Sequence, residues 1–388
     1  MKFKLIAFSL FTIAAQAQSE NDYYKFSADL YHNLEKDTTA WKYQMSASYF
    51  SISGYYKTAL EIWDKNGFRK PAPMTTSDSL LFAKSKPLNA RNYILNRSKN
   101  ESLIVINEAH TNARHRTFTR SLLKGLYDNG YRYLGLEALH DTLINKRKFP
   151  VLDSGFYTRE PEFGNLLSEA LKIGFTVFGY EASDGKNGKE REIEQAQNIK
   201  RFIDSHPKGK VLIHCGHDHV FENEYKPWEK AMTGRLKEYM DIDPFTINQS
   251  LFPEKGNPAL NHPFINRISQ KESVILQLES GAIFNGLSNP KQTDIVVLHP
   301  TTNYQNNRPD WLQDGRVSYT VPKKKIKNTP VLVTAYRAKE YDQKGIPADI
   351  VEIIGKEIPP LYLEPGTYDI ILKNKNYTIT ERYTITLK

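Results

Sequence analysis

Four apolar runs in the middle of the chain have the length of buried strands, and each ends in glutamate or histidine. They span residues 102–107, 133–137, 174–180 and 210–213, with helix-patterned segments between several of them. The ionisable residues at or just beyond their ends are Glu108, His110, Glu137, Glu181 and His214. This alternation predicts an α/β fold with a mostly parallel sheet flanked by helices. The carboxyl ends of parallel strands meet at one edge, where ligands bind, so we expect one site there.

The α/β pattern extends over residues 96–317. Within it we expect helices over residues 114–127, 163–172 and 190–205. We expect further strands over residues 244–248, 273–279 and 294–299.

Segments of different character flank this region. Residues 18–95 are aromatic-rich with helical spacing and are interpreted as a helical N-terminal extension. Within them, residues 66–90 carry the Gly, Pro and Ser residues of a connector. Residues 318–388 alternate apolar and polar side chains around turns such as Pro365-Gly366. That pattern predicts a small C-terminal antiparallel β-sandwich domain.

Residues 1–17 have the pattern of a signal peptide. Lys2 and Lys4 precede a short apolar core, and Ala15-Gln16-Ala17 forms a small-residue cleavage site. We therefore expect an exported protein, periplasmic or secreted. No later run is long and apolar enough to predict a transmembrane span.

Net charge and cysteine content bear on whether the chain binds nucleic acid and whether it can form disulfides. The formal charge of +9 falls to +7 when the two lysines of residues 1–17 are removed, and the basic residues are scattered apart from Lys323-Lys324-Lys325. A solvated basic surface is expected, with no nucleic-acid partner. Cys215 is the only cysteine, so no internal disulfide can form, and we interpret it as a small core residue.

Glu108 and His110 leave the first strand two residues apart, a spacing that can aim both side chains into one crevice. A carboxylate beside an imidazole fixes its tautomer and raises its basicity, as a general base acting on water requires. Either group can also bind a metal. Glu137 and Glu181 end strands in apolar surroundings, so each needs a partner, for which His110 or Arg191 would serve.

A second motif, Gly216-x-x-His219, follows the last of the four strands. Glycine allows a tight turn there, and His214 and His217 lie close to His219 in sequence. His115, near the start of the first helix, is expected either at the pocket mouth, where it could bind an anion or metal, or exposed to solvent.

At these residues the chain resembles the Tiki/ChaN/erythromycin-esterase superfamily, over roughly residues 100–312. Members carry Gly-Glu-x-His or Gly-x-x-His after a first strand, a Glu ending the next strand, and a later Gly-x-x-His. Here Asn107-Glu108-Ala109-His110, Glu137 and Gly216-His217-Asp218-His219 match them. His115 resembles a second histidine of ChaN-like members, the Arg191 to Asn198 segment resembles an esterase pattern, and so does Asn307 to Leu312. Asn107 replaces the first glycine.

The resemblance implies three chemistries. Erythromycin esterases are metal-free hydrolases that activate water with Glu and His, Tiki proteins are metal-dependent proteases, and ChaN-like proteins bind haem.

Our leading hypothesis is a hydrolase of ester or amide bonds in a small-molecule or peptide substrate. Its catalytic residues would be Glu108, His110, Glu137 and His219. A divalent metal (Mn, Co or Zn) could be held by His110, Glu137 and His219. The alternative is a haem- or iron-binding protein that uses His110 or His115 with a nearby tyrosine. A third is a non-catalytic protein, and the oligomeric state stays open.

Overall fold

The computed structural model describes residues 23–388 apart from residues 68–69, 72 and 288–289. The predicted signal peptide, residues 1–17, lies outside the described residues. Within them, no helix is both long enough and apolar enough to cross a membrane.

A six-stranded parallel sheet forms the centre of the molecule, with strand order β10-β8-β2-β5-β3-β4. The strands are β2 (Leu103–Glu108), β3 (Tyr131–Leu136), β4 (Thr176–Gly179), β5 (Lys210–Gly216), β8 (Phe245–Asn248) and β10 (Ile295–Val296). The four strands predicted to end in ionisable residues are therefore neighbours. This confirms the predicted sheet.

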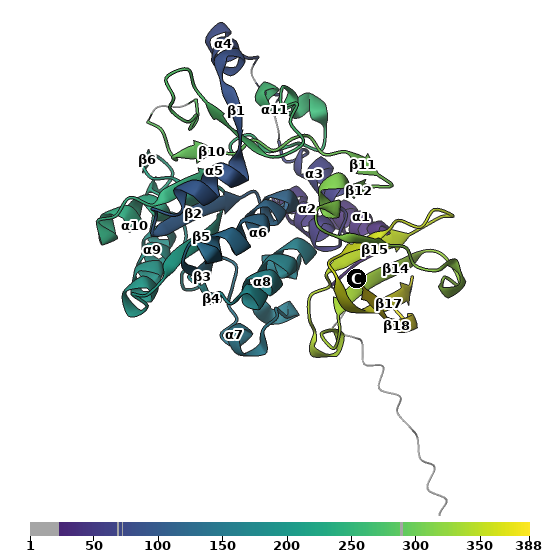
Figure 1. Ribbon diagram of the computed structural model, residues 1–388. Helices are drawn as coiled ribbons and strands as arrows, with labels where there is room; N and C mark the ends of the chain where they lie inside the picture. Colours follow the sequence, from purple (N-terminus) through teal and green to yellow (C-terminus); the bar gives the residue numbers. More distant parts are fainter. Residues whose placement is uncertain (1–22, 68–69, 72, 288–289) are drawn as a thin grey trace, which may run out of the picture.

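Helices cover both faces of this sheet (Figure 1). One face carries α5 (Ala90–Arg97), α6 (Ala113–Asp128) and α8 (Pro161–Ile173), and the other carries α9 (Gly188–Ser205) and α10 (Met232–Met240). Successive residues of β2 divide between the two cores, with Ile104 and Ile106 in one and Leu103 and Val105 in the other. Burial on both faces explains why the strands are apolar throughout.

The C-terminal residues form two antiparallel sheets that share one core. The larger contains β14 (Val331–Arg337), β15 (Asp349–Ile353), β17 (Gly366–Asn374) and β18 (Ile379–Leu387). The smaller pairs β13 (Val317–Tyr319) with β16 (Leu361–Leu363). Leu361 of the smaller sheet and Val333 of the larger lie in the same hydrophobic cluster. The predicted small β-sandwich is confirmed.

Three helices precede the sheet, α1 (Ser27–Lys36), α2 (Lys42–Ile52) and α3 (Tyr56–Trp63). Phe26 and Ile52 cluster with Leu332 and Ile350 of the β-domain. The N-terminal helices therefore bind the C-terminal domain.

The predicted connector, residues 66–90, differs from expectation. It contains α4 (Thr76–Lys84), which begins at a capping box formed by Thr75 and Asp78, and β1 (Lys86–Asn89). β1 pairs antiparallel with β9 (Val274–Gln277), so the strand predicted at residues 273–279 lies outside the central sheet. The remaining short elements are α7 (Ile144–Arg147), α11 (Pro263–Asn266), β6 (Glu224–Tyr225), β7 (Glu229–Lys230), β11 (Tyr304–Gln305) and β12 (Arg308–Pro309).

Glu162 of α8 ties the sheet region to the segment that leads into the β-domain, because Arg316 donates two hydrogen bonds of 2.6 and 2.7 Å to its carboxylate. Burial alone raises the pKa of Glu162, but Arg316 outweighs it and lowers the pKa from 4.5 to about 2. In the unfolded chain, the carboxylate of Glu162 takes up a proton near its ordinary pKa. The stability from this pair is therefore present above that value and lost as the pH falls toward 2.

We expect Glu162→Gln to flatten the acid side of the stability profile. Between roughly pH 5 and pH 3 the wild type should lose about 2 kcal/mol more of its unfolding free energy than the variant. Denaturant titrations at each pH measure this, and equal losses in both proteins would contradict it.

Candidate functional site

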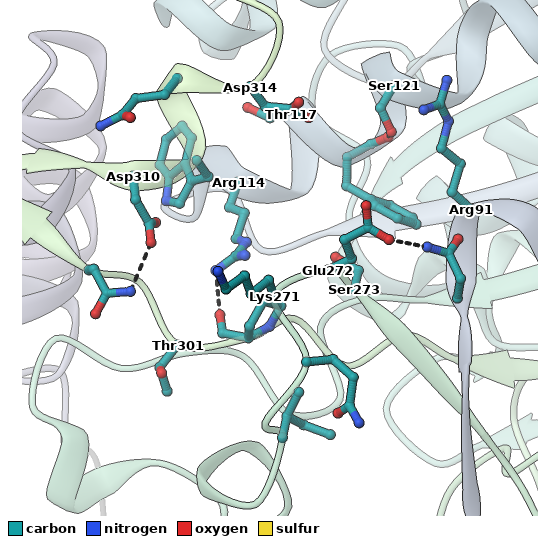
Figure 2. Close-up of a pocket in the computed structure, with 18 of the residues that line it drawn as sticks. Arg91, Arg114, Thr117, Ser121, Lys271, Glu272, Ser273, Thr301, Asp310 and Asp314 are labelled. Carbon is teal, nitrogen blue, oxygen red and sulfur yellow. Dashed lines mark hydrogen bonds between the residues drawn. The ribbon is translucent and has the colours of Figure 1, made fainter.

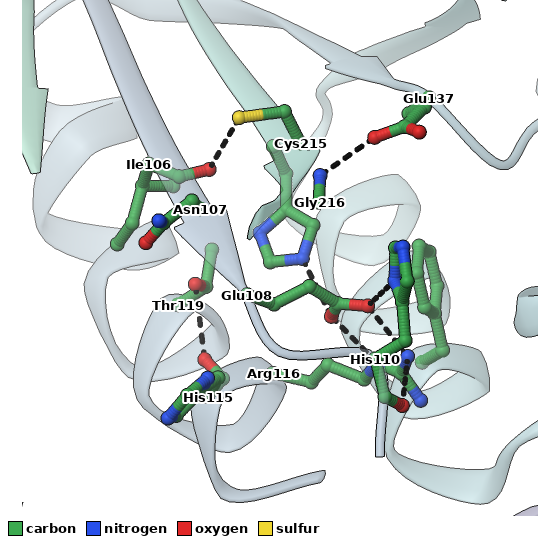
Figure 3. A network of polar contacts seen from close by, with 12 residues as sticks. Ile106, Asn107, Glu108, His110, His115, Arg116, Thr119, Glu137, Cys215 and Gly216 are labelled. Atoms are coloured by element: carbon green, nitrogen blue, oxygen red, sulfur yellow. Dashed lines mark hydrogen bonds and ion pairs between the residues drawn. The ribbon is translucent and has the colours of Figure 1, made fainter. Parts of the chain in front are cut away.

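Glu108 lies at the end of β2 and is the centre of a buried hydrogen-bond network (Figure 3). Its Oε1 accepts from His110 Nδ1 at 2.9 Å and from Arg116 Nη2 at 2.6 Å. Its Oε2 accepts from Arg116 Nε at 2.6 Å and from His214 Nε2 at 2.9 Å. Four donors thus fill the acceptor positions of one carboxylate.

This network sets which ring nitrogen of neutral His110 carries the proton. Burial alone would raise the pKa of Glu108, but the charge of Arg116 and the hydrogen bonds from Arg116, His110 and His214 hold it well below its usual value. The carboxylate is therefore ionised and accepts the Nδ1–H of His110. In neutral His110 the lone pair lies on Nε2, as a general base requires.

The ring of His110 is packed on two sides and retains 17% of its side-chain surface exposed. Tyr157 stacks on it with ring centroids 4.0 Å apart, and His217 meets it edge-on at 4.9 Å. Burial and the charges of Glu137 and Glu108 raise the pKa of Tyr157 to about 12, so its phenol stays neutral.

Gly216 has a different role from the tight turn that its motif predicted. Its backbone is extended, with φ −84° and ψ 148°. A Cβ at this position would lie 2.4 Å from Cε1 and 2.5 Å from Nε2 of His110, and 3.2 Å from Glu137 Oε2. Glycine is therefore required because two site residues approach the backbone of β5.

We expect Gly216→Ala to fold but to displace His110, and so to slow any reaction that depends on this histidine roughly 10²-fold. Gly355→Ala is the matched control, because a Cβ there meets nothing within 4 Å. The rate constants and the unfolding free energies of both variants should be measured together. A Gly216→Ala variant with full activity would contradict the close approach.

Arg191, on α9, organises the second half of the site. Its Nε and Nη2 donate to the carboxylate of Glu181 at 2.9 and 2.6 Å, and Nη2 also donates to Glu137 Oε1 at 2.5 Å. Glu137 Oε2 accepts the backbone N–H of Gly216 at 2.6 Å. Of the two partners suggested for these strand-end carboxylates, His110 and Arg191, the structure places Arg191 in hydrogen-bond contact with both.

His219 completes this second cluster. Nη1 of Arg191 lies 2.9 Å from His219 Nε2, and arginine can only donate, so Nε2 accepts while Nδ1 donates to Glu192 at 2.8 Å. Burial lowers the pKa of His219, but Glu137 and Glu192 raise it by more. Protonation at Nε2 would place two N–H groups against each other and force the guanidinium of Arg191 to shift.

The neighbours His219, His110 and Arg191 oppose the effect of burial on the pKa of Glu137. Burial raises the pKa of Glu137, and these neighbours with the Gly216 N–H lower it to about 2. Glu137 is therefore an acceptor and not a proton donor near neutral pH.

The predicted metal ligands do not fit a metal ion in this arrangement. Among the described residues, no group of three or more His, Cys, Asp and Glu side chains is placed to hold one. The Nε2 lone pair of His219 and one oxygen of Glu137 are both taken by Arg191. The guanidinium supplies the positive charge between these groups.

The histidines and the tyrosine proposed as haem ligands do not fit a haem group in this site. His110 and Tyr157 stack face to face at 4.0 Å, which leaves no room for a porphyrin between their rings. His115 is fully buried beside His299, so its expected place at a pocket mouth or in solvent is wrong. Its Nδ1 accepts the N–H of Ala109 at 2.9 Å and thereby supports the loop between Glu108 and His110.

Asn107 clamps the ends of three segments together. Its amide nitrogen donates to the His217 carbonyl at 2.6 Å and to Ser250 Oγ at 2.7 Å, and its oxygen accepts from Gln249 N at 2.7 Å. The backbone of Asn107 is not left-handed, whereas that of the neighbouring His217 is, with φ 39°. Burial and the neighbouring His110 lower the pKa of His217 to about 3, so its ring stays neutral.

Several residues of the site were missing from the sequence prediction. Arg116 is the most important, because it joins Glu108 to Glu160, which also accepts from Tyr56 Oη of α3 at 3.1 Å. A buried strand-end carboxylate signals that a cation must be near, and Arg116 lies in the first turn of the following helix. Tyr157 lies in an irregular loop that has no periodic signal.

Cys215 is buried with a raised thiol pKa, as a core residue should be.

No protein-family model matches the chain, and no curated protein does either. Solved structures match at low identity. The type III effector HopBA1 is 13% identical over 56% of this chain and 96% of its own, with a TM-score of 0.36. ChaN of Campylobacter jejuni, described with cofacial haem binding, is 12% identical over 56% of this chain and 94% of its own, with a TM-score of 0.33.

A variant of the erythromycin esterase EreC in its open conformation is 11% identical over 71% of this chain and 65% of its own, with a TM-score of 0.20. Values in this range assign neither a family nor an activity, and the superfamily membership stays a prediction from the motifs.

Proposed function

We propose that the chain is a hydrolase in which His110 activates water for attack on an ester or amide carbonyl. The observation that carries the proposal is the contact of 2.9 Å between Glu108 and His110, within a carboxylate held by four donors. A histidine whose Nδ1 is fixed by an ionised, immobile carboxylate presents Nε2 as a base.

The reaction follows from this arrangement. His110 Nε2 takes a proton from water as the water oxygen bonds to the carbonyl carbon. When the tetrahedral intermediate collapses, the bond to the leaving oxygen or nitrogen breaks and His110 returns the proton to it. Arg191, with 27% of its side chain exposed, places a positive charge where it would stabilise the developing negative charge on oxygen.

Turnover of a substrate panel tests the proposal. The wild-type chain would be offered activated esters, simple alkyl esters and short peptides, and product formation followed against enzyme concentration. We expect at least one ester or amide class to be hydrolysed in proportion to enzyme. No turnover of any member would count against the hydrolase, and a haem absorption band on titration would favour the alternative.

A further inference from the structure

A groove of 1050 Å³ lies along another side of α6 (Figure 2). It shares no lining residue with the clusters around Glu108 and Arg191. Arg114 lines it, whereas Arg116 bonds to Glu108, and two positions along a helix turn the side chain by roughly 200°. The groove is therefore a separate surface from the candidate active site.

Most of the groove is built from hydrogen-bonding side chains. Amides of Asn89, Asn92 and Gln270 line it together with hydroxyls such as Ser121 and Thr301. The charged groups there balance, since Arg91, Arg114 and Lys271 face Glu272, Asp310 and Asp314. The apolar side chains among the lining residues are Phe118, Ile268, Pro300 and Trp311. The many donors, acceptors and charges of the lining favour a polar ligand over a lipid or an apolar peptide anchor.

Arg114 supplies a specific anchor in this groove. It is 9% exposed, and its Nη1 donates to the Pro300 carbonyl and to Thr302 Oγ1. No hydrogen bond joins its Nε or Nη2 to any described residue. This Nε–Nη2 fork is open to the groove, and its geometry matches the two oxygens of a carboxylate.

We propose that this groove binds a saccharide chain that carries a carboxylate, of the uronic-acid type. The carboxylate pairs with Arg114, the indole of Trp311 packs on the C–H face of a sugar ring, and the amides and acidic side chains bond to ring hydroxyls. A binding site of this kind would hold the protein, or its substrate, on an acidic polysaccharide.

Calorimetric titration with a galacturonic acid trimer and a galactose trimer tests this. We expect the wild type to bind the acidic trimer roughly tenfold or more tightly than the neutral one, as a charged hydrogen-bonded pair implies. Arg114→Gln should remove that preference, and Trp311→Leu should weaken both trimers. Arg132→Gln, an exposed arginine outside the groove, should change neither.

The wild-type comparison needs no variant, so a folding defect cannot obscure it. Absence of binding to both trimers, equal affinity for both, or a preference that survives in folded Arg114→Gln would overturn the proposal. So would tighter binding of a peptide through its C-terminal carboxylate.

Discussion

His110→Ala is expected to lower the rate of hydrolysis by roughly 10²–10⁴-fold while leaving the fold intact. The ring supplies the base, and the carboxylate that orients it stays held by Arg116 and His214 when the ring is removed. The loss should therefore fall on turnover and only weakly on substrate affinity. Steady-state kinetics on the best substrate of the panel measure kcat and KM separately.

The control for this experiment is His32→Ala, because His32 is an exposed histidine on α1. It should retain wild-type rates. If His110→Ala also kept full activity, His110 would not be the base and the proposed reaction would be wrong.

Arg116→Met is expected to be the most destabilising single change in the site, with a loss of roughly 3–5 kcal/mol of unfolding free energy. Arg116 is fully buried and bridges the carboxylates of Glu108 and Glu160, which are themselves buried. Methionine would fill much of the volume but leave both charges without their counter-ion. Denaturant titration at neutral pH measures the loss.

Lys124→Met is the matched control on the same helix, since the ion pair of Lys124 with Asp128 is exposed and should contribute little. The deficit of Arg116→Met should also shrink as the pH falls, because protonation neutralises the carboxylates left unpaired. A loss below about 1 kcal/mol, or one independent of pH, would contradict the role given to Arg116.

The sheet could be predicted because strands buried on both faces, such as β2 and its neighbours, need long apolar runs in the sequence. Their polar ends then placed Glu108, Glu137 and Glu181 at one edge, where Arg191 donates hydrogen bonds to the last two. The prediction failed for segments whose structure depends on distant partners. The residues of β1 include a proline and have the composition of a connector, yet β1 pairs with β9 far along the chain.

The same limit applies to the site. Tyr157 and Glu160 lie in a loop of short 3₁₀ turns, where spacing carries no information about direction. His115 follows the pattern of a helix start and so suggested exposure, but packing against His299 buries it. Gly216 was correctly singled out, although the reason is the approach of the His110 ring, which only the tertiary structure reveals.

In the proposed reaction, His110 oriented by Glu108 activates water and Arg191 stabilises the developing negative charge, so that no metal ion is needed. The most direct measurement is the hydrolysis rate of one wild-type sample before and after chelation, with elemental analysis of both. We predict an unchanged rate and no stoichiometric manganese, iron, cobalt or zinc. A stoichiometric metal that is lost in His110→Ala and His219→Ala, and whose removal abolishes hydrolysis, would contradict the claim.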